Sequence, residues 1–146
     1  MEKINSKDNS HSFIPPNVRF IMGGIGIPYG EMLRGYTENR VGPFSTTRGG
    51  NIMLKYSLEF RFSISVNPTI YALSFFEMGN VWLDMEDVDP FDLKRSAGIG
   101  IRVFIPMLGM LGYDIGYGFD YTDYDEIYNS TEPHGWEYHL IFGMPF

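Results

Sequence analysis

Residues 52–65 constrain the fold of this chain more than any other stretch. Their even positions are all apolar or aromatic, whereas the odd positions after Met53 are all polar or charged. The apolar set is Ile52, Leu54, Tyr56, Leu58, Phe60, Phe62 and Ile64, and the polar set is Lys55, Ser57, Glu59, Arg61, Ser63 and Ser65. Because successive side chains of a β-strand point to opposite faces, this period of two predicts a strand with one apolar and one ionic face.

Four further segments are predicted to be long strands. They are residues 69–82, 96–105, 111–121 and 136–146. The alternation is clearest in the third of these, whereas Leu73, Phe75 and Phe76 blur it in the first. The connecting segments are residues 66–68 and 106–110, which are short, and residues 83–95 and 122–135, which are long and acidic. Strands joined in this way predict an all-β fold, an antiparallel up-and-down meander of about five long strands.

Two architectures show such a pattern, a soluble β-sandwich and a transmembrane β-barrel. The predicted strands have 10 to 14 residues. Strands of soluble domains usually have about 5 to 6 residues, whereas about 9 to 11 tilted residues cross a bilayer. The polar face carries glycine and isolated charges, which is typical of a barrel lumen. We therefore expect a transmembrane barrel, and because so few strands cannot close in lipid without an open edge, we expect the chain to be part of a larger one.

Composition narrows the class of function. The net charge is −7 at pH 7 and the Lys and Arg residues are not clustered, which argues against a nucleic-acid partner. No apolar run approaches the length of about 18 residues that a spanning helix needs. The first residues are polar and lack the apolar segment of a secretory signal peptide. The absence of cysteine argues against a disulfide-stapled domain.

Acidic residues gather in the two long connections. The first group is Asp84, Glu86, Asp87, Asp89 and Asp92, and the second is Asp120, Asp123, Asp125, Glu126 and Glu132. Neither has the spacing of an EF-hand, so solvated loops are one interpretation and a calcium site is the other. His11, His134 and His139 have neither metal-ligand spacing nor an accompanying nucleophile motif. We expect no catalytic, cofactor-binding or metal-binding residues, and hence no enzyme.

Several motifs resemble one family. They are Leu33-Arg34-Gly35-Tyr36, Val41-Gly42-Pro43, Gly49-Gly50-Asn51, Leu58-Glu59-Phe60-Arg61-Phe62, Phe75-Phe76-Glu77-Met78-Gly79-Asn80-Val81-Trp82 and Ser96-Ala97-Gly98-Ile99-Gly100. In this order they are similar to the C-terminal part of the outer-membrane protein assembly factor BamA family (BamA/TamA-like, bacterial surface antigen barrel). The resemblance implies the C-terminal segment of a sixteen-stranded transmembrane β-barrel. Residues 1–17 would be a disordered or extended lead-in, residues 18–50 a strand end plus a long loop, and residues 51–146 the five last strands.

The resemblance also implies roles for particular side chains. In that family an Arg-Gly-aromatic loop tip folds back into the lumen and meets acidic residues on the inner wall. Carried onto this chain, the tip is Arg34, Gly35 and Tyr36, and the wall acids are Glu59 and Glu77, where the family often has aspartate at the second position. The residue pattern agrees for Glu59, because a carboxylate buried on the polar face needs a partner such as a guanidinium. From the residues alone, a solvated loop arginine is the favoured interpretation of Arg34, because most loop arginines are solvated, and the resemblance reverses that preference.

The final strand carries a second implied site. Its alternating residues Tyr138, Leu140, Phe142, Met144 and Phe146 are similar to the C-terminal assembly signal of outer-membrane proteins. In the family this strand also pairs weakly with the first barrel strand at a lateral seam. Gly143 and Pro145 are expected to weaken pairing there, because glycine packs little and proline lacks an N–H donor.

The function that the resemblance implies is an insertase, which folds and inserts outer-membrane β-barrel proteins without a cofactor. The implied location is the outer membrane of a Gram-negative-type bacterium, with the C-terminus in the periplasm. The implied partners are the lipid bilayer, client outer-membrane β-barrel proteins and accessory assembly lipoproteins. The alternative is a protein-secretion or solute pore of the same superfamily, such as a two-partner secretion transporter or a patatin-fused barrel.

Overall fold

The strands form one antiparallel sheet. The computed structural model describes residues 19–26, 30–43, 49–127 and 134–143. Its strands are β1 (Ile52–Val66), β2 (Thr69–Trp82), β3 (Lys94–Ile105), β4 (Gly109–Gly118) and β5 (Gly135–Gly143). They pair in the order β1-β2-β3-β4-β5, each with the next in the chain. The predicted all-β meander is therefore confirmed.

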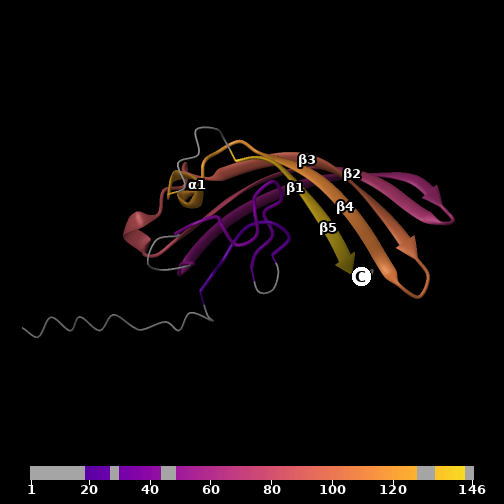
Figure 1. The fold of residues 1–146 in the computed structure, drawn as a ribbon, viewed down its shortest axis with the longest axis horizontal. Coiled ribbons are helices and arrows are strands. Elements are labelled where there is room, and N and C mark those ends of the chain that lie inside the picture. The colour runs from indigo at the N-terminus through magenta and orange to yellow at the C-terminus, as the bar shows by residue number, and fades with distance from the viewer. Residues whose placement is uncertain (1–18, 27–29, 44–48, 128–133, 144–146) are drawn as a thin grey trace, which may run out of the picture.

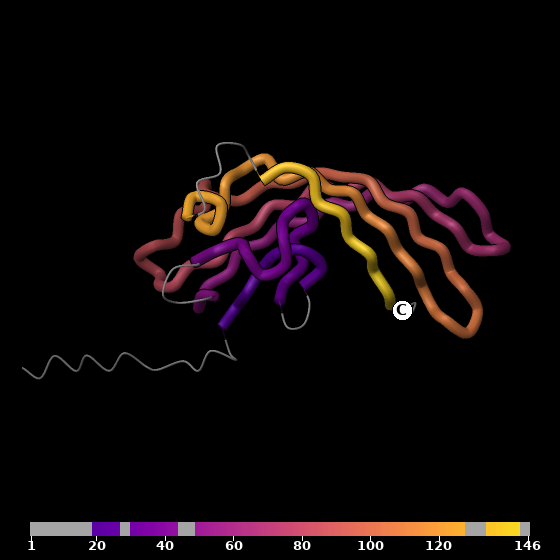
Figure 2. Tube along the Cα trace, in the orientation of Figure 1, coloured from indigo at the N-terminus to yellow at the C-terminus, as the bar shows by residue number. Residues whose placement is uncertain are grey.

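The sheet is arched, and the segment before β1 lies beneath the arch on its concave side (Figure 1). The short turns after β1 and β3 lie at one end of the sheet, and the longer connections lie at the other (Figure 2). The described end of β5 lies at the end with the short turns. This arrangement is the one expected for part of a β-barrel sheet with a loop folded into the lumen.

The convex face of the sheet is apolar and exposed. Its exposed large side chains are Tyr56, Leu58, Phe60, Phe62, Ile64, Phe76, Ile99, Ile101, Tyr113, Trp136, Tyr138, Leu140 and Phe142. Ile101 is 42% exposed and Leu140 is 51% exposed, so these side chains do not meet in a sealed core. A sandwich would bury such a face against a second sheet. The exposed face instead suits a strand that meets lipid on its outer side.

The concave face is covered by the segment that precedes β1. Met22, Leu33, Tyr36 and Val41 of that segment pack with Val81 of β2 in one buried cluster. Leu73 and Phe75 of β2 also lie on this face and are almost fully buried. Their burial explains the blurred alternation of residues 69–82, because β2 is apolar on both faces where the loop covers it.

Residues 19–22 form isolated bridges in the described part of the chain, and the strand expected to end here would begin outside the described residues. In the part of the chain that the structure describes, Phe20 bridges to Gly50, and Met22 bridges to Glu31 and Val41, but no ladder continues. Gly23 and Gly24 follow with φ values of 134° and 60°, a conformation that turns the chain away from a regular strand. The expected packing of the long loop holds for Leu33 and Tyr36, while Tyr29 and Phe44 lie outside the described residues.

The strand β4 ends three residues earlier than expected. The chain leaves the ladder near Asp120, because Oδ2 of this carboxylate accepts the backbone N–H of Arg95 at 2.7 Å and takes a position that a backbone carbonyl would otherwise fill. Beyond it, the expected loop 122–135 contains a short helix, α1 (Asp123–Ile127).

A capping box begins α1. Asp125 Oδ2 accepts the backbone N–H of Thr122 at 3.0 Å, and Thr122 Oγ1 accepts the backbone N–H of Asp125 at 3.3 Å. The other acidic connection contains a single 3-10 turn, η2 (Met85–Asp87). Neither described helix has the length and apolar character needed to cross a membrane.

A charge placed on the convex face tests which side of the sheet meets lipid. We expect Ile99→Arg, in the full-length protein reconstituted in lipid vesicles, to lower the free energy of unfolding by about 2–4 kcal/mol. Ser63→Arg is the matched control, because Ser63 lies on the concave side of β1 and is exposed. Denaturant titration would measure both variants, and equal losses would contradict the assignment of the faces.

Candidate functional site

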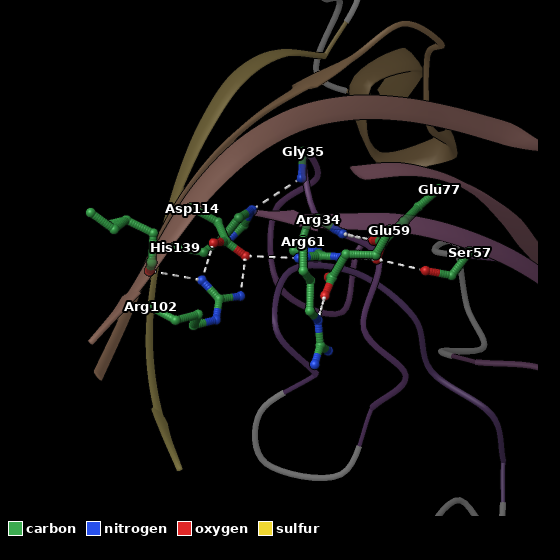
Figure 3. Close-up of polar contacts among 10 residues, drawn as sticks. Arg34, Gly35, Ser57, Glu59, Arg61, Glu77, Arg102, Asp114 and His139 are labelled. Atoms are coloured by element: carbon green, nitrogen blue, oxygen red, sulfur yellow. Dashed lines mark hydrogen bonds and ion pairs between the residues drawn. The ribbon is translucent and has the colours of Figure 1, made fainter. Parts of the chain in front are cut away.

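The loop tip places a buried arginine on the inner wall of the sheet. Arg34 is 2% exposed. Its Nε and Nη2 donate to Glu77 Oε1 at 3.0 and 2.6 Å, and its backbone N–H donates to Glu77 Oε2 at 2.8 Å. Nη2 also donates to Glu59 Oε2 at 2.9 Å, and Nη1 donates to Asp114 Oδ2 at 3.0 Å (Figure 3). One side chain from the loop thus contacts carboxylates of β1, β2 and β4.

Strand geometry brings these acids to the same face. Glu59, Glu77 and Asp114 come from different strands, and each occupies a position whose side chain points into the arch. Ser57 Oγ also donates to Glu77 Oε1 at 3.2 Å. Below the guanidinium lies the ring of Phe75, with the Arg34 Cζ atom 3.9 Å from the ring centroid. The planar cation is therefore hydrogen-bonded at its edge and stacked on an aromatic face, which a lysine could not reproduce.

Two more arginines complete the cluster. Arg102 of β3 donates through both Nη atoms to Asp114, with Nη2 2.8 Å from Oδ2. Arg61 Nε donates to Glu59 Oε1 at 2.6 Å from an exposed side chain. Three guanidinium groups therefore face three carboxylates, and formal charge balances within the cluster. Such balance is needed because an unpaired charge in a buried place costs several kcal/mol.

The charge of Arg34 is secured by these partners. Burial alone would lower its pKa, but hydrogen bonds and charges from Glu77 and then Asp114 outweigh burial and raise the pKa above its ordinary value. The guanidinium therefore remains a cation over the whole physiological range of pH. The hydrogen bonds of the cluster are charge-assisted, the strong class of protein hydrogen bond.

Glycines form a floor beneath the tip. Gly98, Gly116 and Gly118 lie on the concave face of β3 and β4, and a Cβ atom at Gly116 would come within 2.7 Å of the backbone nitrogen of Gly35. Gly35 itself has φ +87°, and a Cβ atom there would approach the Cβ of Ser96 to 2.8 Å. The loop backbone therefore lies directly on strand backbone, an approach that only glycine allows.

Tyr36 and Thr37 continue the contact along the wall. The Tyr36 hydroxyl donates to the carbonyl oxygen of Arg95 at 2.7 Å, and its side chain is fully buried. Burial raises the pKa of Tyr36, so the hydroxyl keeps its proton and its role as donor. Gly35 N–H donates to His139 Nε2 at 3.0 Å, and Thr37 N–H donates to His134 Nε2 at 3.0 Å.

The structure brings together five of the residues that the sequence singled out. Arg34, Gly35, Tyr36, Glu59 and Glu77 share one site under the arch. The set expected on the last strand lies elsewhere. Its described members Tyr138, Leu140 and Phe142 are exposed on the convex face, and Met144 and Phe146 lie outside the described residues.

Several contributors were not assigned to the site from sequence. They include Ser57, Arg61, Phe75, Arg102, Asp114 and His139. Asp114 had a usable signal, because it is a charge in the middle of the polar face of residues 111–121, with glycine two positions away on each side. Gly112 and Gly100 leave the space that the Arg102–Asp114 pair occupies, since a Cβ atom at Gly112 would lie 2.7 Å from Arg102 Cδ.

The acidic connections have a simpler arrangement. Asp84, Glu86, Asp87, Asp89 and Asp92 are all exposed. Among the described residues, no group of three or more His, Cys, Asp or Glu side chains is placed to hold a metal ion. In the second group, Asp120 contacts Arg95, and Asp125 caps α1 and contacts His134, while Asp123 and Glu126 are exposed.

The model of the Omp85 superfamily domain matches residues 3–138 of this sequence. The chain belongs to the Omp85 superfamily. Omp85 proteins are outer-membrane β-barrels of protein insertion or secretion, and they assemble or transport proteins and are not enzymes. The exposed convex face is therefore the lipid face of an outer-membrane barrel. No curated protein matches the chain closely enough to count as a relative.

Filling the glycine floor tests how the tip is seated. We expect Gly116→Val to displace the tip and to destabilise the full-length protein by about 1–3 kcal/mol, because the added side chain overlaps the Gly35 backbone. Valine favours strands, so β4 itself should not suffer. Gly143→Val is the control, because nothing lies within 4 Å of a Cβ atom there. Unfolding titrations in lipid would compare them, and an equal response at both positions would contradict this seating.

Proposed function

We propose that this chain is the C-terminal barrel section of a BamA-like insertase, which folds and inserts other outer-membrane β-barrel proteins. The observation that carries the proposal is the Arg34 cluster, in which one loop arginine is bound by carboxylates of three strands. Arg34, Gly35 and Tyr36 would act as a loop lock, with Glu59 and Glu77 as its receptors. Asp114 would be a third receptor.

The lock would hold the loop and the wall in one arrangement. Removing one partner from a buried ion pair typically costs about 3–5 kcal/mol, because the other charge is left uncompensated. The loop could therefore leave the wall only when several bonds break together. A scaffold that receives unfolded clients needs such a rigid interior, since the client supplies no structure of its own.

The covered concave face favours an insertase over a solute pore. Residues 19–26 and 30–43 pack onto the sheet and bury Met22, Leu33, Tyr36 and Val41 against it. A wall that lined an open channel would present its polar side chains to water instead. The chain would then act at its lipid boundary and not through its interior.

The last strand is the proposed place of action. In the described sheet β5 is an edge strand and pairs with β4 alone. An edge presents unpaired N–H and C=O groups that can bind a further strand. We propose that β5, with its C-terminus in the periplasm and its signal residues Tyr138, Leu140, Phe142, Met144 and Phe146, forms the seam where client strands enter. The lipid bilayer, client barrels and accessory lipoproteins would be the partners, with no nucleic acid involved.

Substituting the tip arginine tests the loop lock and the activity together. We expect Arg34→Lys to raise proteolysis of the loop at least tenfold and to slow insertion of a client barrel, because lysine keeps the charge but loses the fork that spans Glu77, Glu59 and Asp114. The assay would use the full-length protein in vesicles, with an unfolded outer-membrane porin as client.

Arg61→Lys is the matched control, because the Arg61 side chain is 66% exposed and contacts the same Glu59. Arg61→Lys should leave the rates of loop proteolysis and of client insertion within about twofold of those of the unaltered protein, as expected for an exposed ion pair. Normal client insertion with an exposed loop would argue against the proposed function. Export of a secreted protein without any client insertion would assign the chain to the secretion branch of the superfamily.

A further inference from the structure

The loop tip also contacts β5 and the residue before it, through two imidazole rings. Gly35 N–H donates to Nε2 of His139 on β5 at 3.0 Å (Figure 3). Thr37 N–H donates to Nε2 of His134 at 3.0 Å. An imidazole nitrogen accepts a hydrogen bond only when it carries no proton. Both contacts therefore require an unprotonated Nε2.

We propose that His139 and His134 form a histidine latch that positions the loop tip on the last strand, with His139 as a permanent anchor and His134 as a contact that mild acid releases. The inference rests on the proposed function, in which the tip is the lock and β5 is the seam strand. It adds a direct link between those two parts, which the carboxylates of β1, β2 and β4 do not provide.

His139 is neutral at Nε2 in this arrangement, because that nitrogen accepts the Gly35 N–H. The residue is 6% exposed. It lies beside the Arg34 cluster, since Gly35 directly follows Arg34. The facing acids are Asp114 of β4, Glu137 of β5 and Glu38 of the loop. Asp114 is its cross-strand partner, but that carboxylate is already held by Arg34 and Arg102. His139 therefore remains an acceptor for Gly35.

The surroundings of His134 are different, because carboxylates face both of its nitrogens. Nδ1 lies 3.0 Å from Asp125 Oδ2 at the start of α1, and Nε2 lies 3.2 Å from Glu137 Oε1 on β5. The Tyr36 ring packs beside it, with the ring centroids 5.1 Å apart. Burial alone would lower the pKa of His134, but hydrogen bonds to Glu137 and Asp125 outweigh it and raise the pKa above its ordinary value.

Protonation would change the partner of His134 Nε2. In the neutral ring, Nδ1–H donates to Asp125 and Nε2 accepts from Thr37 N–H. In the imidazolium, Nε2–H donates to Glu137 and can no longer accept from Thr37. The tip loses one backbone hydrogen bond, while the ring becomes a cation and forms ion pairs with both Asp125 and Glu137. Thr37 Oγ1, which donates to Glu137 Oε1 at 2.7 Å, keeps the tip nearby.

This exchange predicts opposite effects on the fold and on the tip. A histidine with a raised pKa stabilises the folded state fully below its unfolded pKa of about 6.5, and that contribution is lost as pH rises through the folded pKa. The pKa of Asp125 is lowered, because hydrogen bonds from Thr122 and His134 outweigh its burial, so its contribution persists until pH falls toward its folded pKa. As pH falls through the raised folded pKa of His134, the fold should therefore hold while the tip loosens.

The test measures exposure of the loop in the full-length protein in outer-membrane vesicles. The proteolysis rate of the loop is measured at pH 8 and pH 5.5, divided by the rate on an unfolded peptide at the same pH, and the unfolding midpoint is measured in parallel. We expect the unaltered protein to be cleaved roughly twofold to tenfold faster at pH 5.5, the effect of one lost hydrogen bond, with no fall in the midpoint. His134→Gln should abolish the pH dependence, because the amide oxygen accepts from Thr37 at either pH.

His139 is tested by loss and by conservative rescue. His139→Ala should raise the cleavage rate at both pH values, and His139→Gln should restore it, because Gln Oε1 can accept from Gly35 N–H. Ser63→Gln is the control, since Ser63 is exposed on the concave side of β1 and lies outside the proposed seam strand. A pH profile unchanged by His134→Gln, or a His139→Gln variant as exposed as His139→Ala, would overturn the latch. These readouts report the loop and not client insertion, so failure of the latch is distinguishable from failure of the proposed function.

Discussion

The buried guanidinium of Arg34 is the interaction on which the arrangement of this chain depends. It binds three carboxylates from three strands and stacks on Phe75. None of these acids could be buried alone without a large cost, and neither could the arginine. The loop and the wall therefore depend on each other. The loop supplies the cation that pairs with the inward-facing acids of the wall. The wall supplies the carboxylates that allow the guanidinium of Arg34 to be buried away from water.

The rest of the concave face serves this contact. Gly116 and Gly118 bring the tip backbone onto the sheet, and the cluster around Met22 and Val81 holds the flanks of the loop in place. The convex face has no such covering among the described residues, and its aromatic and aliphatic side chains remain exposed. The alternating strand pattern thus matches two environments. The convex face meets lipid, and the concave face meets a packed, hydrogen-bonded interior.

Much of this fold could be predicted from the sequence, because apolar and polar residues alternate with period two in a strand whose two faces meet different environments. The exceptions have physical causes. Leu73 and Phe75 broke the alternation because both are buried on the concave face, where Arg34 of a loop distant in sequence stacks on Phe75, and pattern analysis does not detect such a contact. The helix α1 was missed although Thr122 and Asp125 have the spacing of a capping box, since five residues are too short to show a helical period. Arg34, Glu59 and Glu77 were found by resemblance. Asp114 could be placed on the polar face of its strand, but its position opposite His139 depends on cross-strand register, which one sequence does not reveal.

The glycine floor has a consequence for how the barrel wall is checked as it forms. Sliding β4 by one residue against β3 would reverse its faces, so that Tyr113, Ile115 and Tyr117 pointed inward and Asp114 pointed to lipid. Those bulky side chains would fill the space that the tip backbone needs, and the arginine would lose a receptor. The loop can therefore bind only when β3 and β4 are paired in the native register. Its binding reports that the strands are correctly aligned, in addition to holding the loop on the wall.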